Sequence, residues 1–216
     1  MCSQTLPDHK NTSFEQKLRR GLEDLNADLP QELWTLISWL EQRGQSFVFN
    51  NSQAPFLSTS MVSSIDELWS QVNFVLPQDF MHHWIGKTGY EQQIIPFVRC
   101  GGDGSYFALW ESDDAPSRFV FLGSEGEAFV VAEDVRAFMA LISMGYHSVE
   151  GREMLAATPS EIWSEWYDDP WPQSDQLAAW LTEVFGITLP ARGADLLPYP
   201  AKADPFTAFI EKVCGG

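Results

Sequence analysis

The residues of this chain that could do acid–base chemistry are mostly carboxylates, and some of them stand in adjacent pairs. Asp113-Asp114 and Asp168-Asp169 have the residue types of a catalytic pair, in which one group acts as acid and the other as base. Each doublet stands one or two residues before a proline, in a segment typical of turns. Solvated loop charges are the more common interpretation of such doublets, and a metal-dependent hydrolase stays open as an alternative.

Motifs of other enzyme classes do not occur in the sequence. His82-His83 is the only adjacent histidine pair, and neighbouring residues of a helix point in different directions, whereas zinc-binding helices place histidines four residues apart. No glycine-rich loop precedes a helix with a lysine, and no Gly-x-Ser-x-Gly segment is present. Three scattered cysteines fit neither a zinc site nor a disulfide framework. The sequence therefore predicts no catalytic residue, no cofactor and no metal.

The glycine-rich segment Gly101-Gly102-Asp103-Gly104 lies between two strand-like runs. Glycine there supplies positive φ angles, and Asp-Gly is a favoured pair for a tight hairpin. We expect a hairpin turn at this position and not a loop that cradles a ligand.

Aromatic residues and carboxylates alternate near residue 165. Trp163, Trp166 and Tyr167 stand close together, with Trp171 following shortly after. Glu161, Glu165 and Asp168 are spaced so that a helix would place them on one face. Large aromatic residues usually belong to the core, but an aromatic group edged by carboxylates is also typical of a surface that binds Lys and Arg. Both interpretations stay open.

Acidic residues outnumber basic ones by thirty to thirteen, which gives a formal net charge of −17. The imbalance is uneven: residues 101–216 carry nineteen acidic and six basic groups. Such a field repels nucleic acid and anionic lipid and attracts basic proteins. We therefore predict a basic protein partner and binding to neither nucleic acid nor membrane, although the charge could also serve solubility alone.

Composition predicts a globular chain with its own core. The apolar fraction is 44% over 216 residues, so the chain can bury a core without metal or disulfides. The longest apolar runs are far shorter than the ~20 residues that a bilayer requires, and residues 1–20 lack an apolar signal region. With so few cysteines, a reducing cytoplasm is the expected location.

Periodicity divides the chain into helical ends and a strand-rich middle. Helical spacing starts at Phe14 and again after Pro30, a loop is expected at Asn50–Ser60, and a helix is expected from Ser63 to Val72. Four short apolar runs then predict strands: Ile94–Val98, Tyr106–Trp110, Phe119–Leu122 and Ala128–Val131. Their short connections favour an antiparallel meander over residues 94–131.

Helical spacing returns after this meander. The predicted helices are Asp134–Ile142, Pro159–Tyr167, Ser174–Phe185 and Asp204–Val213. Before the meander, another helical turn or two is expected at Pro77–Trp84. The expected fold class is α+β: a mainly antiparallel sheet flanked by N- and C-terminal helices.

The meander resembles the SUKH superfamily, the bacterial immunity proteins related to the fungal cell-wall-synthesis regulator. The matching residues are Ile95-Pro96-Phe97-Val98, the Gly-Asp-Gly hairpin, Val120–Gly126, Phe129–Glu133 and Phe138. The Leu29-Pro30 helix start and the segment from Trp180 to Phe206 also look like parts of some family members. The polar residues 1–12 predict a flexible leader. The resemblance implies a SUKH-like domain over 13–150 and a helical extension over 151–216 packed on the same domain.

The resemblance implies a non-enzymatic protein that binds and neutralises a cognate polymorphic toxin, frequently a nuclease. Because nucleases grip phosphates with basic surfaces, the acidic charge fits such a partner. A regulatory adaptor or scaffold in stress or cell-envelope signalling is an alternative that the same superfamily implies. The expected partner-binding residues are carboxylates at the strand turns and residues of the aromatic segment: Glu111, Asp113, Asp114, Glu125, Glu127, Glu161, Glu165, Trp166 and Asp168.

Overall fold

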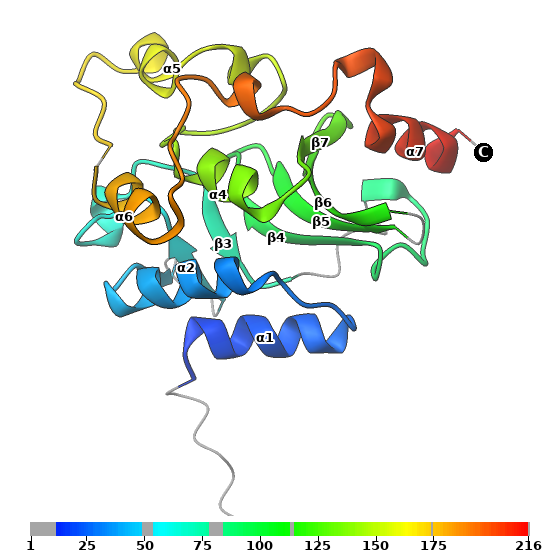
Figure 1. Cartoon of the computed structure of the whole chain (residues 1–216), viewed down its shortest axis with the longest axis horizontal. Helices are drawn as coiled ribbons and strands as arrows, with labels where there is room; N and C mark the ends of the chain where they lie inside the picture. Colours follow the sequence, from blue (N-terminus) through cyan, green and yellow to red (C-terminus); the bar gives the residue numbers. More distant parts are fainter. Residues whose placement is uncertain (1–11, 49–53, 78–83, 113–114, 174, 216) are drawn as a thin grey trace, which may run out of the picture.

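A seven-stranded antiparallel sheet forms the centre of the protein, with strands in the sequential order β1 to β7 (Figure 1). The computed structural model describes residues 12–48, 54–77, 84–112, 115–173 and 175–215. Helices lie at both ends of the chain, which confirms the predicted α+β class with a mainly antiparallel sheet. The predicted leader lies outside the described residues apart from Thr12, and the domain division at residue 150 stays a prediction.

The strands of the predicted meander are all present. The seven strands are β1 (Ser46–Val48), β2 (Pro55–Ser58), β3 (Asn73–Val75), β4 (Ile94–Arg99), β5 (Tyr106–Ser112), β6 (Ala115–Leu122) and β7 (Ala128–Ala132). Each pairs with the next strand in an antiparallel register. Strands β4 to β7 confirm the meander, because their connections are too short for parallel crossovers.

Two predictions before the meander are wrong. The loop expected at Asn50–Ser60 contains strand β2, which begins with a proline, a residue tolerated at the first position of a strand. The helix expected from Ser63 to Val72 is only a 3-10 turn at Ile65–Glu67. Beyond it the Gln71 N–H donates to the His147 carbonyl oxygen (2.7 Å) and not to a carbonyl one turn earlier. Tertiary contacts therefore override helical spacing here.

The observed helices lie close to the positions that the spacing of apolar residues predicts. They are α1 (Phe14–Asp24), α2 (Gln31–Gln42), α4 (Val135–Ser143), α5 (Pro159–Trp166), α6 (Asp175–Phe185) and α7 (Pro205–Cys214). Side chains of Ser13, Asp134, Thr158 and Asp204 accept hydrogen bonds from N–H groups of the first turns. None of the helices in the described ranges combines the length and the apolar character needed to span a bilayer. Most of the turn predicted at Pro77–Trp84 falls outside those ranges.

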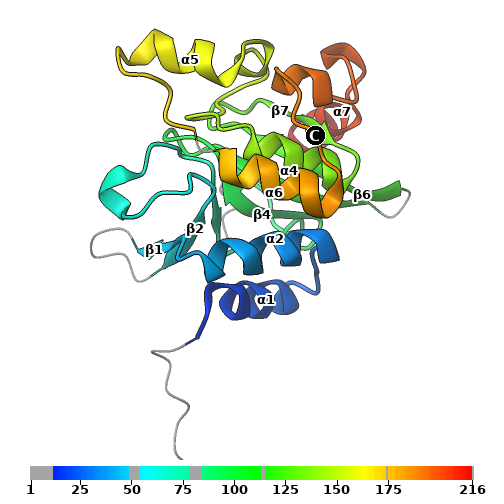
Figure 2. The ribbon, with the colours of Figure 1, turned by 60° about the vertical axis from the view of Figure 1, so that its left-hand side comes forward.

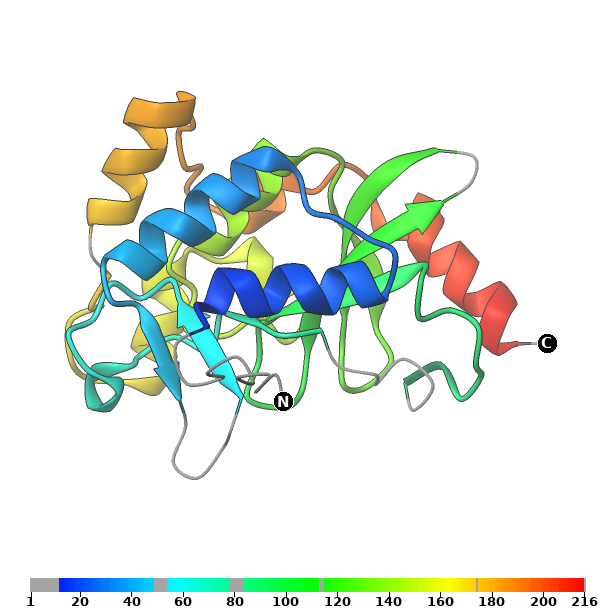
Figure 3. The ribbon, with the colours of Figure 1, turned by 90° about the horizontal axis from the view of Figure 1, so that it is seen from below.

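Both faces of the sheet are apolar, because neighbouring residues of each strand point to opposite sides and both are hydrophobic. In β6, Phe119 and Phe121 join the core beneath α1, α2, α4 and α6, whereas Val120 and Leu122 join a second core. Phe206, Ile210 and Val213 of α7 cover that second face. Figure 2 accordingly shows α4 and α6 side by side, and Figure 3 shows α7 on the other side of the strands from α1 and α2.

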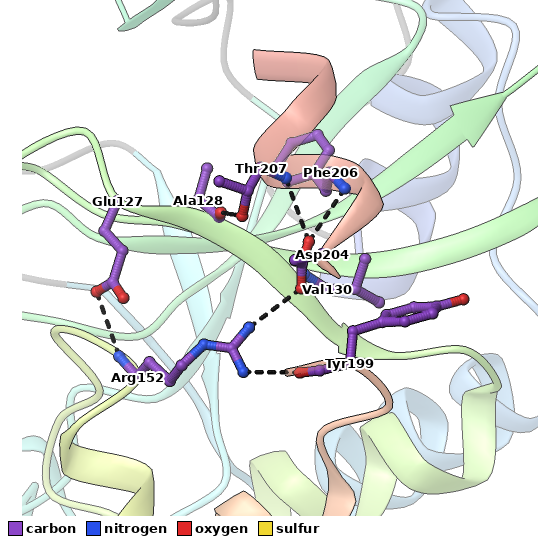
Figure 4. Close-up of polar contacts among 8 residues, drawn as sticks. All are labelled: Glu127, Ala128, Val130, Arg152, Tyr199, Asp204, Phe206 and Thr207. Carbon is purple, nitrogen blue, oxygen red and sulfur yellow. Dashed lines mark hydrogen bonds and ion pairs between the residues drawn. The ribbon is translucent and has the colours of Figure 1, made fainter. Parts of the chain in front are cut away.

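A buried carboxylate attaches α7 to the sheet edge (Figure 4). Asp204 accepts hydrogen bonds from the N–H groups of Val130 in β7 and of Phe206 and Thr207 in α7. The Arg152 guanidinium donates to the same carboxylate at 3.1 Å and to the Tyr199 carbonyl oxygen at 2.9 Å. The Asp204 side chain is fully buried, so these donors must compensate for the loss of water around its carboxylate.

We expect Asp204→Asn to lower the free energy of unfolding by about 3 kcal/mol, because it leaves the Arg152 charge without its buried partner. Asp134→Asn is the matched control: it changes the exposed cap of α4, where Asn caps as well as Asp, and should shift stability by less than about 0.5 kcal/mol. Urea unfolding followed by circular dichroism measures both. Equal effects of the two substitutions would show that the buried ion pair contributes nothing of its own.

Candidate functional site

Among the described residues, the carboxylates predicted at the strand turns lie at opposite ends of β6. Asp113 and Asp114 lie outside the described residues. Glu111 lies in β5, where it accepts a hydrogen bond from the Ser117 hydroxyl at 2.6 Å. Glu125 and Glu127 are exposed in the turn between β6 and β7. The Glu127 carboxylate accepts from the Arg152 N–H at 3.2 Å, so it fixes the chain after α4 as well as facing solvent.

Asp103 ties together two turns at this end of the sheet. Its carboxylate accepts from the N–H and hydroxyl of Ser105 at 3.0 and 2.8 Å, and from the Ser124 hydroxyl in the β6–β7 turn at 2.5 Å. Burial raises the pKa of Asp103, but these hydrogen bonds outweigh it and lower the pKa overall. The hairpin predicted at Gly101–Gly104 is present, with Gly104 at φ 99°, and Asp103 has a structural role in it.

We expect Asp103→Asn to lower the free energy of unfolding at pH 7 by about 1 kcal/mol, because it weakens charge-assisted hydrogen bonds at an exposed site. Since the folded-state pKa is lowered, the carboxylate stabilises the protein above its unfolded pKa of about 4. This contribution is lost as the pH falls through the folded pKa.

Denaturant unfolding from neutral pH to about pH 3 checks the prediction, because the gap between wild type and variant should narrow with acidification. Glu125→Gln, in the neighbouring turn, is the control and should leave stability within about 0.5 kcal/mol. A gap that stays constant or widens in acid would contradict the assignment.

The predicted acidic helical face at α5 is only partly formed. α5 starts with a capping box, in which Thr158 and Glu161 exchange hydrogen bonds between side chain and backbone. The N–H and hydroxyl of Thr158 lower the pKa of Glu161, whose carboxylate is therefore engaged in the cap. Because the helix ends at Trp166, Asp168 lies beyond it and does not share a helical face with Glu161 and Glu165.

An aromatic cluster supports the end of α5. Trp163 and Tyr167 are stacked with ring centroids 4.1 Å apart, and the His147 ring contacts both edge-on at 5.7 and 5.3 Å. Trp69, from the segment before β3, packs against Trp163 at 6.3 Å. The Trp69 carbonyl oxygen accepts from His147 Nδ1, so in the neutral ring Nε2 accepts from the Tyr167 hydroxyl at 3.2 Å.

Indole and amide donors fix the chain that follows α5. Trp163 Nε1 donates to the Asp169 carbonyl oxygen at 2.8 Å, and Trp171 Nε1 donates to the Gly145 carbonyl oxygen at 3.1 Å. Gln173 Nε2 donates to the Ser143 carbonyl oxygen at 3.2 Å. The residues between α5 and Gln173 are thereby held against the segment after α4.

Two large aromatic residues remain exposed on this fixed segment. Trp166 is 71% exposed and Tyr167 is 40% exposed, whereas Trp163 is only 8% exposed. Three exposed carboxylates adjoin them in sequence. We name this set the α5 surface: Glu165, Trp166, Tyr167, Asp168 and Asp169. Exposed aromatic residues are enriched at protein interfaces, so this set is the candidate binding site.

His147 and Trp69 support the α5 surface but were not among the predicted site residues. Trp69 stands in the segment expected to be helical from Ser63 to Val72, where only a 3-10 turn at Ile65–Glu67 forms. Their contacts join segments far apart in sequence, so no local pattern identifies them.

No group of three or more His, Cys, Asp and Glu residues arranged to hold a metal ion occurs within the described ranges. A surface pocket of about 230 Å³ lies beside Arg152, and another of about 340 Å³ lies between α1, α2 and α6. Neither contains the α5 surface.

The sequence matches no protein-family model, and neither the curated proteins nor the solved structures include one that is significantly similar to it.

Proposed function

We propose that this chain is a binding protein of the immunity type, which neutralises a basic toxin domain, a nuclease, by direct contact. The observation that carries the proposal is the α5 surface. Trp166 exposes 71% of its surface to solvent, and the backbone beside it is fixed by hydrogen bonds. A large aromatic side chain on a fixed backbone is the kind of anchor that dominates binding energy in protein complexes.

The charge of the chain favours a basic partner. The α5 surface has three carboxylates, and the whole chain has a formal net charge of −17. Complementary charge steers diffusional encounter and disfavours acidic partners. The choice of a toxin as partner depends on the resemblance of the β4–β7 residues to the SUKH superfamily. A nuclease has the basic, phosphate-binding surface that would complement this protein.

One prediction of this proposal concerns the rate at which the chain associates with a purified basic nuclease toxin domain, which is to be sought among the products of neighbouring genes. We expect that rate constant to fall at least tenfold between about 0.05 and 0.5 M salt, because salt screens long-range attraction. Stopped-flow fluorescence measures it, and co-expression in a host that carries the toxin tests protection. A toxin domain that does not bind, or that kills the host equally with and without the chain, would refute the proposal.

The second prediction concerns the site. The double variant Glu165→Gln with Trp166→Ala should weaken toxin binding by tenfold or more, since it removes an anchor and part of its acidic rim. Both side chains are exposed, so the thermal unfolding midpoint should stay within a few degrees of wild type.

A matched control exists on α6, where Glu183 and Val184 are also an exposed carboxylate followed by an exposed apolar residue. Glu183→Gln with Val184→Ala should leave the dissociation constant unchanged within about twofold. If the control variant weakens binding as much as the α5 variant does, the α5 surface is not the binding site.

A further inference from the structure

We propose that the α5 surface recognises an arginine of its partner, whose guanidinium lies over the Trp166 or Tyr167 ring and pairs with an adjacent carboxylate. The inference rests on the proposed function and names the group that the same site receives. Arginines of this protein itself contact an aromatic ring and a carboxylate together, which is the arrangement proposed for the partner.

Arg19 and Arg118 each contact an aromatic ring and a carboxylate together. The Arg19 guanidinium carbon lies 3.8 Å from the centroid of the Trp34 ring, and Arg19 pairs with Glu15 at 2.8 Å. The Arg118 guanidinium carbon lies 5.8 Å from the Trp110 ring centroid, and Arg118 pairs with Glu133 at 3.6 Å.

Arg152 has the same two kinds of contact in a more buried setting. Its guanidinium carbon lies 4.4 Å from the Phe129 ring centroid, and its Nη2 pairs with Asp204 at 3.1 Å. The combination of aromatic ring, carboxylate and arginine therefore occurs in α1–α2, beside β5–β6 and at β7. Arg43 adds a fourth arginine over a ring, 3.8 Å from the Trp39 centroid.

The α5 surface has the ring and the carboxylates of this arrangement without the cation. Within the ranges that the structure describes, no arginine or lysine lies over Trp166 or Tyr167, and none forms an ion pair with Glu165, Asp168 or Asp169. The position that an arginine takes at the other three clusters is open to solvent here. A basic partner can supply it.

Guanidinium suits this surface better than ammonium. It is planar, more weakly hydrated and able to stack on a ring while it pairs with a carboxylate, whereas a lysine ammonium is a compact, strongly hydrated charge. Trp163 stacks on Tyr167, and His147 bonds the Tyr167 hydroxyl, so the ring is held in place before a partner arrives. Ordering the Tyr167 ring on binding therefore costs little conformational entropy.

Matched peptides test the inference without the toxin. The probes are acetyl-Gly-Arg-Arg-Gly-amide and the same peptide with lysine or with neutral citrulline in place of arginine. Binding is followed by NMR on the full chain through the indole N–H signal of Trp166, assigned with Trp166→Phe. We expect saturable shifts with the arginine peptide, an affinity at least threefold lower with lysine, and no saturable shift with citrulline.

Variants locate the response. Glu165→Gln with Asp168→Asn should weaken arginine-peptide binding several-fold, whereas Glu183→Gln on α6 should not change it. Equal affinity for arginine and lysine, or peptide-induced shifts that leave the signals of both Trp166 and Tyr167 unchanged, would overturn the inference. The toxin experiment separates this failure from a failure of the proposed function. A toxin that binds through Trp166 while the peptides show no arginine preference would leave the function intact and remove only the inference.

Discussion

The sheet is apolar on both faces, and the rest of the structure follows from the need to cover each of them. Strands β4 to β7 place residues such as Phe121 on one side and Leu122 on the other, all buried. A two-layer fold would leave one of these faces in water. Burying apolar surface stabilises a folded protein by roughly 25 cal/mol per Å². Leaving one face of the sheet uncovered would therefore remove much of the stability that its apolar side chains provide. Helices α1, α2, α4 and α6 therefore cover one face of the sheet, and α7 covers the other.

Within the segment after residue 150, α7 covers the second face and α5 carries the α5 surface. α7 closes the second core, and Asp204 satisfies the N–H groups where the chain turns onto β7. Earlier in the same segment, α5 is attached through Trp163 and His147 to the residues before β3, at the end of the molecule away from α1 (Figures 1 and 2). The aromatic contacts that complete the fold there also hold the exposed Tyr167, and Trp166 precedes it as the last residue of α5.

Local patterns predicted the elements whose stability is local. The helices at Phe14, Pro159 and Asp204 have caps and apolar stripes in their own sequence, and the four runs of the meander have glycine-rich or polar turns between them. Strands β2 and β3 were missed because they are four and three residues long, and their pairing partners, not their composition, define them. The helix expected before β3 fails because Ser70 and Gln71 bond to residues 146 and 147.

The tryptophans near residue 165 show where sequence reasoning ends and geometry begins. Core and interface were both open for the whole cluster, and the structure divides it: Trp163 is buried, whereas Trp166 and Tyr167 are exposed. Spacing alone could not make this division, because α5 ends at Trp166 and the chain then leaves the helical path. An exposed tryptophan removes little apolar surface from water within its own protein, so it adds little to the free energy of unfolding. Beside carboxylates on a backbone held by hydrogen bonds, the gain from burying it is available to a partner, and we propose that the acidic rim favours a basic one.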